Sequence, residues 1–167
     1  DVLYLMGVDE CDLSNISDKT FVIYQGHHGD AGARAADAVL PGAAWCEKDA
    51  IFANSEGRIQ YANRAAFPPG DAREDWSIIR ALSAVLGHTL SFDNHEALRA
   101  EMIAAHPIFG EADVRVEAKM KLPSSRAKIA ATALTTPIGE GAATSFYMTC
   151  PISRSSVTMA ACIEAFE

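Results

Sequence analysis

The stretch FVIYQGHHGDAGARAADAVLPG, residues 21–42, carries the strongest signal for the fold of this chain. It opens with a run of β-branched and aromatic residues, 21–26, that ends in glycine, which is typical of a strand. The small residues at 30–38 are compatible with a helix, and the apolar run at 38–42 predicts another strand, which a Pro-Gly pair ends. A strand, a short helix and a strand in this order imply an α/β fold with a parallel sheet.

The sequence on either side of this stretch predicts further elements. The apolar run at 2–7 predicts a buried strand, and residues 50–67 predict a hairpin because two β-rich runs flank a Ser-Glu-Gly turn. Residues 111–145 show the least periodicity and predict an extended arm, after which Ser153 is the expected cap of a final helix. Two helices are predicted between the hairpin and the arm. Asp71 and Glu74 are the expected capping box of the first helix, and Gly87 is its expected end. Asp93 and Glu96 are the expected capping box of the second helix, and Pro107 is its expected end.

The composition of the chain argues against some classes of function. Apolar residues make up 49% of the chain and the net charge is −8, whereas a protein that binds nucleic-acid backbones needs clustered Lys and Arg. No apolar run reaches the length needed to cross a bilayer, so we expect no direct membrane insertion. The chain opens on Asp1 without a methionine or a basic leader, and we expect it to be a segment of a longer polypeptide.

Three glycines make the first candidate site. Gly26, Gly29 and Gly32 end the strand and open the helix, where backbone N–H groups can hold an anion. Their spacing is G-x-x-G-x-x-G rather than the dinucleotide fingerprint G-x-G-x-x-G, and the lysine of the phosphate loop is absent. A strand-to-helix turn that needs small residues is the favoured interpretation, and a phosphate cradle stays open as the alternative.

The histidines and cysteines indicate no metal centre or nucleophile. His27 and His28 are adjacent, so on a strand their side chains diverge, and a structural role is favoured over a metal-binding pair. Cys46 has no histidine in register with it that would mark a catalytic thiol. All four cysteines are widely spaced without a C-x2-C pair, which favours reduced side chains over a cluster site: Cys11, Cys46, Cys150 and Cys162.

The stretch NSEGRIQ contains a second turn. Asn54 and Gly57 are turn formers, and an ion pair between Glu56 and Arg58 is expected either to lock the turn or to reach a neighbouring domain. From composition and spacing alone, the chain is a soluble α/β fragment with no visible catalytic constellation.

Residues 21–60 resemble the molybdopterin oxidoreductase superfamily. More narrowly, three segments look like the large iron–sulfur subunits of respiratory complex I, which are the G subunits of the bacterial enzymes. They are residues 21–60, PPGDAREDWSIIRALS at 68–83 and FYMTCPISRSSVTMAAC at 146–162. The three segments match in the same order along the chain. The matching residues in the first segment are Ala36-Asp37, Val39-Leu40-Pro41, Glu47-Lys48, Asn54, Glu56-Gly57-Arg58 and Gln60.

The resemblance implies a fold made of fragments of doubly wound parallel lobes, with a C-terminal arm and helix. Residues 1–49 would end one α/β lobe, residues 50–110 would supply a hairpin and two helices to a neighbouring lobe, and residues 111–167 would form the arm and helix. Where molybdenum enzymes usually have a Gly-Thr pair, this chain has residues 49–52, Asp-Ala-Ile-Phe, which argues against retained pterin binding. The vestigial cofactor-lobe residues would be Gly26, Gly29, Gly32, Glu47 and Asn54.

The function implied by the resemblance is that of a scaffold. The parent enzyme passes electrons from NADH through FMN and iron–sulfur clusters to quinone, and this segment would hold no catalytic residue, metal or cofactor. The clusters would lie in an N-terminal part of the subunit. Its partners would be the rest of its own subunit and other complex I subunits, on the cytoplasmic or mitochondrial-matrix side of the membrane, in the peripheral arm.

Two other functions stay open at this stage. One is the cofactor lobe of a molybdopterin-dependent oxidoreductase, suggested by the shared strand–helix–strand pattern and the turn at 26–32. The other is an isolated anion-binding module, which the same glycine turn suggests.

Overall fold

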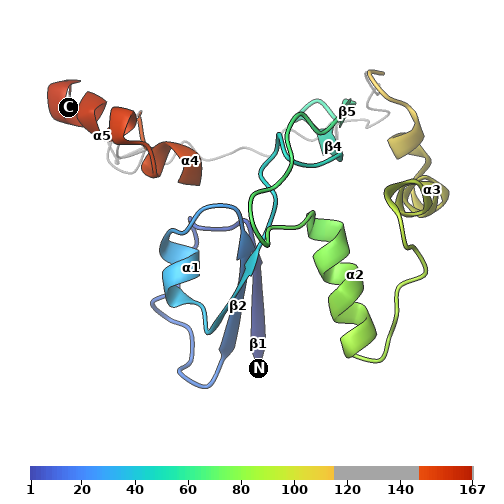
Figure 1. Ribbon diagram of the computed structural model, residues 1–167, viewed down its shortest axis with the longest axis horizontal. Coiled ribbons are helices and arrows are strands. Elements are labelled where there is room, and N and C mark those ends of the chain that lie inside the picture. The colour runs from blue at the N-terminus through green and yellow to red at the C-terminus, as the bar shows by residue number, and fades with distance from the viewer. Residues whose placement is uncertain (115–146, 167) are drawn as a thin grey trace, which may run out of the picture. The chain divides into compact units, whose positions relative to one another are not determined.

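The computed structural model describes residues 1–114 and 147–166, and the chain divides into two units, Asp1–Val116 and Glu117–Glu167 (Figure 1). The described residues of the first unit form a parallel sheet, a hairpin and several helices, and residues 147–166 of the second unit form two short helices. Beyond residue 114, the predicted arm lies outside the described residues. In chain order the elements are β1 (Val2–Met6), β2 (Phe21–Gly26), α1 (Ala31–Ala35), β3 (Ala38–Pro41), β4 (Ala50–Ala53), β5 (Ile59–Ala62), α2 (Asp75–Val85), α3 (His95–Ala105), the 3-10 helix η1 (Pro107–Gly110), α4 (Pro151–Arg154) and α5 (Val157–Phe166).

The three strands β1, β2 and β3 form a parallel sheet with β2 in the centre. Leu5, Val22 and Tyr24 point to one face and form its core, on which residues of α1 and of the loop after β1 pack. Each connection returns to a parallel neighbour, so the predicted α/β class and the parallel arrangement are confirmed.

Tyr24 explains why the turn after β2 contains glycines. A Cβ atom on Gly26 would lie 2.5 Å from the Tyr24 hydroxyl oxygen, and one on Gly32 would lie 2.6 Å from the carbonyl oxygen of Val8 and 2.8 Å from the Tyr24 ring. A Cβ atom on Gly29 would meet nothing within 4 Å. Two of the three glycines therefore make room for a buried tyrosine, and the third does not.

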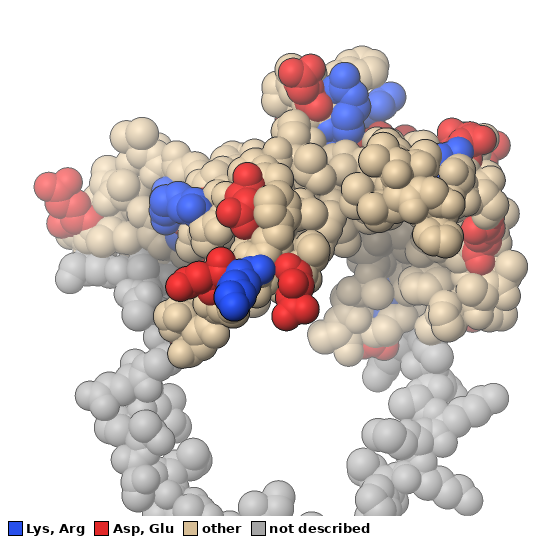
Figure 2. Space-filling model, turned by 90° about the horizontal axis from the view of Figure 1, so that it is seen from below, with Lys and Arg blue, Asp and Glu red and all other residues tan. Residues whose placement is uncertain are grey.

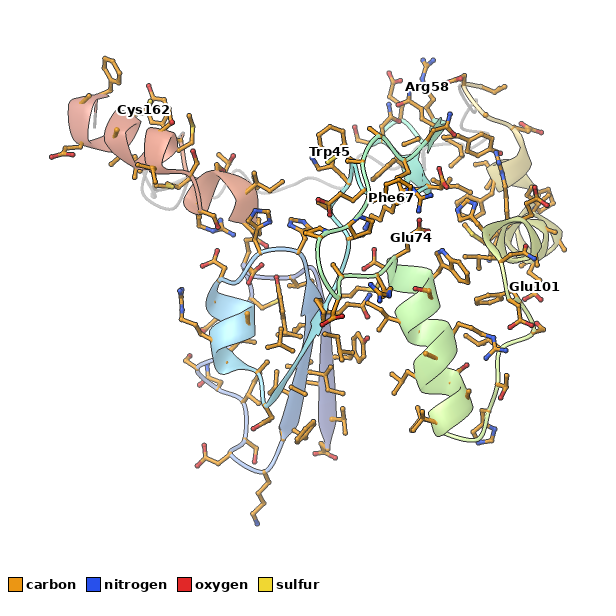
Figure 3. All side chains as sticks on the ribbon, viewed as in Figure 1. Trp45, Arg58, Phe67, Glu74, Glu101 and Cys162 are labelled. Atoms are coloured by element: carbon orange, nitrogen blue, oxygen red, sulfur yellow. The ribbon has the colours of Figure 1, made fainter. Side chains whose placement is uncertain are left out.

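The predicted hairpin is confirmed. Strands β4 and β5 pair antiparallel, and the Oδ1 atom of Asn54 accepts hydrogen bonds from the backbone N–H groups of Glu56 and Arg58, both at 3.0 Å. Gly57 adopts a φ of 80°, a conformation that favours glycine. The Nη2 atom of Arg58, which is labelled in Figure 3, lies 3.6 Å from Oε2 of Glu56, so the expected ion pair forms within the turn.

The predicted capping box of α2 is wrong because the residues before the helix are extended. Arg73 pairs with the end of β3: its N–H donates to Pro41 at 3.1 Å, and its carbonyl accepts from Ala43 at 2.8 Å. The helix therefore begins only at Asp75. Glu74 is the N-cap residue, but its side chain accepts from the indole N–H of Trp76 at 2.7 Å. The predicted end at Gly87 is confirmed, with a φ of 78°.

The cap of α3 lies one residue later than predicted. The Asn94 side chain, not that of Asp93, accepts from the backbone N–H of Ala97 at 2.8 Å. Asp93 instead forms an ion pair with Arg80 of α2, at 2.6 Å. The helix ends at Ala105, and Pro107 begins η1, so the predicted terminator is confirmed.

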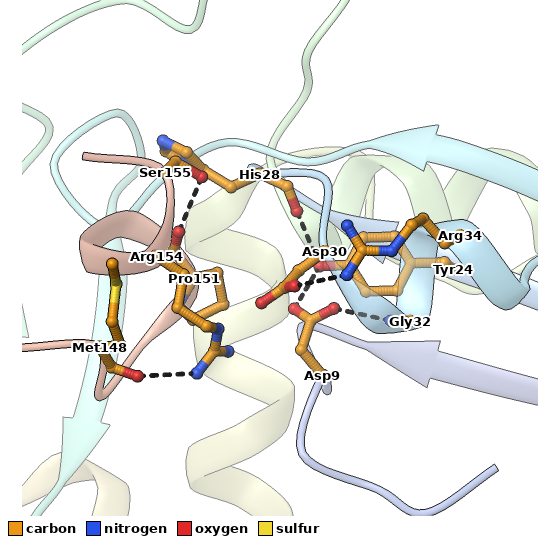
Figure 4. A network of polar contacts seen from close by, with 10 residues as sticks. All are labelled: Asp9, Tyr24, His28, Asp30, Gly32, Arg34, Met148, Pro151, Arg154 and Ser155. Atoms are coloured by element: carbon orange, nitrogen blue, oxygen red, sulfur yellow. Dashed lines mark hydrogen bonds and ion pairs between the residues drawn. The ribbon is translucent and has the colours of Figure 1, made fainter. Parts of the chain in front are cut away.

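The described part of the second unit contains a helix cap that the sequence did not suggest. Cys150 is the N-cap of α4, and Ser153 supplies the reciprocal hydrogen bond to its backbone N–H at 3.0 Å. Ser153 therefore serves α4 rather than the final helix, where Ser156 accepts from Met159 at 3.3 Å. The Arg154 guanidinium donates to the carbonyl of Met148 at 3.2 Å (Figure 4).

Replacing Gly32 by alanine is expected to destabilise the first unit. The added Cβ would collide with the Val8 carbonyl oxygen and the Tyr24 ring, which costs about 1–3 kcal/mol of unfolding free energy. The matched variant Gly29→Ala, which meets open space, is expected to change stability by less than about 1 kcal/mol. Urea unfolding followed by circular dichroism measures both, and equal midpoints for the two variants would contradict the packing role of Gly32.

Candidate functional site

Ligands of parallel α/β sheets bind beyond the carboxyl ends of the strands. In this chain a pocket of about 420 Å³ lies there, next to the ends of β2 and β3. Its polar side chains are those of His27, His28 and Glu47. The remaining lining residues are small or cyclic: Gly26, Pro41, Gly42, Ala44, Pro69 and Ala72.

The polar side chains of this pocket have defined partners. The Oε2 atom of Glu47 accepts from the backbone N–H of Ala44 at 2.9 Å and so closes the turn after β3. The Nδ1 atoms of His27 and His28 lie 2.6 Å apart, so one imidazole donates to the other. Their rings meet edge to face, with centroids 4.9 Å apart.

The pKa of His27 is lowered from its ordinary value of 6.5. Burial of the ring is the largest cause, followed by the neighbouring His28 and by the Lys48 ammonium. The carboxylates of Asp75 and Glu47 act in the opposite direction but do not reverse the shift. His27 is therefore held in its neutral form at neutral pH.

A polar network lies behind the pocket. The Gln25 side chain has 0% exposure, and its Nε2 atom donates to Asp75 Oδ1 at 2.7 Å, while its Oε1 atom accepts from the Tyr4 hydroxyl. The other oxygen of Asp75 accepts from the Lys48 ammonium. These four side chains join β1, β2, the turn after β3 and the first residue of α2 at the carboxyl edge of the sheet.

A second cluster occupies the start of α1 (Figure 4). The Asp9 carboxylate, 8% exposed, accepts from the backbone N–H of Gly32 at 2.9 Å and from the Tyr24 hydroxyl at 2.8 Å. Burial, and then the hydrogen bond to Asp9, raise the pKa of the Tyr24 hydroxyl, which keeps it protonated. The N–H group that a phosphate would need is therefore already bound to a carboxylate of the same chain.

This arrangement does not fit a pterin cofactor. The space that a Cβ atom on Gly26 or Gly32 would enter is filled by the Tyr24 side chain, and the Asp9 carboxylate lies at the N–H group of Gly32. A negative charge at that position also repels the phosphate groups of any nucleotide-like cofactor. The favoured interpretation of the glycine spacing, a turn that needs small residues, agrees with this geometry.

The structure brings only some of the sequence-predicted residues together. Gly26 and Glu47 line the pocket, whereas Gly29 does not, Gly32 packs under Tyr24 and Asn54 shapes the hairpin turn. Sequence reasoning missed the two polar networks described above. The one available signal was a glutamine inside an otherwise apolar strand, FVIYQG, because a polar residue at a buried strand position needs partners.

The described residues offer no metal centre of the usual kind. Within 1–114 and 147–166, no three His, Cys, Asp or Glu side chains gather around a common point. All four cysteines are free thiols, with Cys11 and Cys150 exposed and the other two half-buried. In the same ranges, no helix is both long and apolar enough to cross a bilayer.

Comparison with known proteins gives two family matches. Residues 1–85 match the molybdopterin oxidoreductase family, and residues 108–162 match the family of C-terminal regions of the NADH-ubiquinone oxidoreductase G subunit. The two matches follow one another along the chain, and the first spans the sheet, the pocket and α2.

Similar proteins align over nearly the whole chain. The G subunit of the NADH-quinone oxidoreductase of Rickettsia conorii is 40% identical over 100% of this chain and 24% of its own length. The mitochondrial NADH-ubiquinone oxidoreductase 78 kDa subunit of Neurospora crassa is 41% identical over 98% of this chain and 22% of its own length. The NADH-ubiquinone oxidoreductase 75 kDa subunit of Reclinomonas americana is 40% identical over 99% of this chain and 23% of its own length. The chain thus spans about a quarter of the length of these relatives.

Replacing Asp75 by alanine is expected to lower the free energy of unfolding by about 1–3 kcal/mol, because it leaves the buried Gln25 amide without an acceptor. The control Asp93→Ala removes an ion pair whose carboxylate is 79% exposed, and the expected loss is at most about 1 kcal/mol. Urea denaturation of both variants checks this. Similar losses for the two would show that the Gln25 contact contributes little.

Replacing His27 by glutamine is expected to reduce the loss of stability in mild acid. Because the folded-state pKa of His27 lies below 6.5, the unfolded chain takes up the proton first, so stability falls as the pH drops below 6.5 and is unaffected above it. Melting temperatures at pH 7.5 and 5.5 measure the difference. His88→Gln, on an exposed histidine, is the control, and an equal pH response in wild type and His27→Gln would refute the assignment.

Proposed function

The chain belongs to the molybdopterin oxidoreductase family, and within this family we propose that it is a non-catalytic scaffold segment of the large iron–sulfur subunit, the G subunit, of an NADH–quinone oxidoreductase. That enzyme carries electrons from NADH through FMN and iron–sulfur clusters to quinone. The observation that carries the proposal is the alignment, at 40–41% identity over 98–100% of the chain, with proteins named as this subunit. The match of residues 108–162 to the C-terminal family of the G subunit supports it independently.

The scaffold role is supported by surfaces that need a cover. The sheet face opposite its core exposes Val2 at 67%, Met6 at 51% and Phe21 at 49%, although parallel sheets are normally covered on both faces. We propose that the rest of the polypeptide covers this face and completes a doubly wound lobe. The proposed segments are 1–49 as the end of one lobe and 50–110 as part of a neighbouring lobe.

The C-terminal segment, residues 111–167 in this proposal, also exposes apolar side chains that a further surface would cover. Helix α5 is apolar on nearly all sides, with Glu164 as its only charged residue within the helix bounds, and a helix of this kind is normally buried. Val157 and Phe166 are 86% and 76% exposed, and none of the described residues 147–166 is buried. Contacts with other subunits of the complex, or with the rest of the same subunit, would cover it.

We propose that the iron–sulfur clusters of the subunit are held outside this chain. The free cysteines are dispersed, and the described residues do not gather into a ligand set. The peripheral arm, on the cytoplasmic or mitochondrial-matrix side of the membrane, is the proposed location. Figure 2 shows acidic and basic side chains interspersed on the visible face, which gives no support to nucleic acid as a partner.

The rival function, a cofactor lobe of a molybdopterin-dependent oxidoreductase, receives no support from the candidate site. The N–H group of Gly32 donates to Asp9, and the Gln25 amide donates to Asp75 and accepts from Tyr4. An isolated anion-binding module is disfavoured for the same reason. The relatives are named for NADH oxidation with quinone or ubiquinone, not for molybdenum chemistry.

The test is to purify the full-length polypeptide with its complex through an affinity tag and to measure iron, sulfide, molybdenum and pterin. The expected result is co-purification with NADH–quinone oxidoreductase activity, iron–sulfur clusters and neither molybdenum nor pterin. Cys46→Ser and Cys150→Ser are expected to leave the iron content and the cluster electron paramagnetic resonance signals unchanged. Stoichiometric loss of a cluster in either variant, or stoichiometric pterin in the wild type, would overturn the proposal.

A further inference from the structure

We propose that the pocket at the carboxyl edge of the sheet is a socket for an arginine side chain supplied by a neighbouring subunit. The inference rests on the proposed function in that it requires an assembled complex. It concerns the pocket lined by His27, His28 and Glu47, to which the proposed scaffold function assigns no ligand.

The size of the pocket suits one side chain or a small group. Its volume of about 420 Å³ is near the lower end of the range of ~300–1,000 Å³ typical of ligand pockets. The six small or cyclic lining residues supply apolar walls for an aliphatic stem, and Ala44 and Ala72 are buried at 7% and 8% exposure. A long side chain with an apolar stem and a polar end matches such a pocket.

The charge of the pocket favours a cation. Glu47 is the only Asp, Glu, Lys or Arg among the lining residues, and no Lys or Arg of the described chain forms an ion pair with it. The nearby Lys48 is already paired with Asp75. The Nδ1 atoms of His27 and His28 share one hydrogen bond, and partial burial lowers the pKa of His27, so the neutral His27 ring does not cancel the Glu47 charge at neutral pH.

The polar atoms that remain favour a guanidinium over an ammonium. Glu47 uses Oε2 for the Ala44 N–H, and no hydrogen bond of Oε1 is found among the described residues. A guanidinium is planar and delocalised, so it pairs with a carboxylate and stacks on an aromatic ring at the same time, which an ammonium does not do. The two imidazole rings beside Glu47 supply that flat surface.

The first experiment uses wild-type full-length polypeptide and needs no variant. Saturation-transfer NMR compares N-acetyl-L-arginine amide with N-acetyl-L-citrulline amide, its neutral isostere. The arginine probe is expected to bind, and the citrulline probe is expected to bind at least about tenfold more weakly, the effect of losing one charge-assisted hydrogen bond. Equal binding of the two probes would overturn the socket.

The second experiment replaces Glu47 by glutamine. A glutamine still accepts the Ala44 N–H through its amide oxygen, so the turn is retained while the charge is lost. The variant is expected to keep its melting temperature, to lose about tenfold in affinity for the arginine probe, and to release from the assembled complex at lower salt. Glu96→Gln, on an exposed carboxylate of α3 that does not line the pocket, is the matched control and is expected to behave as wild type.

The outcomes separate this proposal from the scaffold function. Normal assembly with unchanged arginine affinity in Glu47→Gln overturns the socket and leaves the scaffold function intact. Failure of the wild type to assemble with the complex overturns the scaffold function, whatever the arginine probe does.

Discussion

The fully buried side-chain amide of Gln25 organises the carboxyl edge of the sheet. An amide that is buried away from water needs both a donor and an acceptor, because burying a polar group without a hydrogen bond lowers the free energy of unfolding. The Tyr4 hydroxyl supplies the donor and Asp75 the acceptor, and Lys48 pairs with the remaining carboxylate oxygen. One glutamine in the central strand thereby fixes a neighbouring strand, the turn after β3 and the start of α2.

Two internal carboxylates, those of Asp9 and Asp75, bind donor groups at the carboxyl edge of the sheet. Asp9 accepts from the N–H group of Gly32, the last glycine of the turn, and Asp75 accepts from the Gln25 amide, so both of these donors are bound by carboxylates of the chain itself. The space under the glycines is filled by Tyr24. What remains is the pocket bordered by Glu47 and the two histidines, whose shape and charge suit a side chain better than a phosphate-bearing cofactor.

The two halves of the chain differ in how they are stabilised. The first unit has a sheet core of Leu5, Val22 and Tyr24 and two buried polar networks beside it. The described part of the second unit has short helices, local caps at Cys150 and Ser156, and no buried residue. This contrast agrees with the separate family matches, since the first part follows the general oxidoreductase pattern and the second follows a pattern described for the G subunit of NADH-ubiquinone oxidoreductase.

The elements whose signals are local could be predicted from the amino-acid sequence. The strands, the hairpin turn around Asn54 and Gly57 and the helix ends at Gly87 and Pro107 follow from apolar runs and from residues that favour or prevent particular φ values. The predicted cap of α2 is wrong because Arg73 pairs with β3. The predicted cap of α3 lies one residue too early because Asp93 forms an ion pair with Arg80. That Asp9, Gln25 and Asp75 form the carboxyl edge is a result of tertiary packing alone. Their partners are distant in sequence, and no spacing rule encodes a hydrogen bond that exists only after the sheet, the turn and the helix have packed.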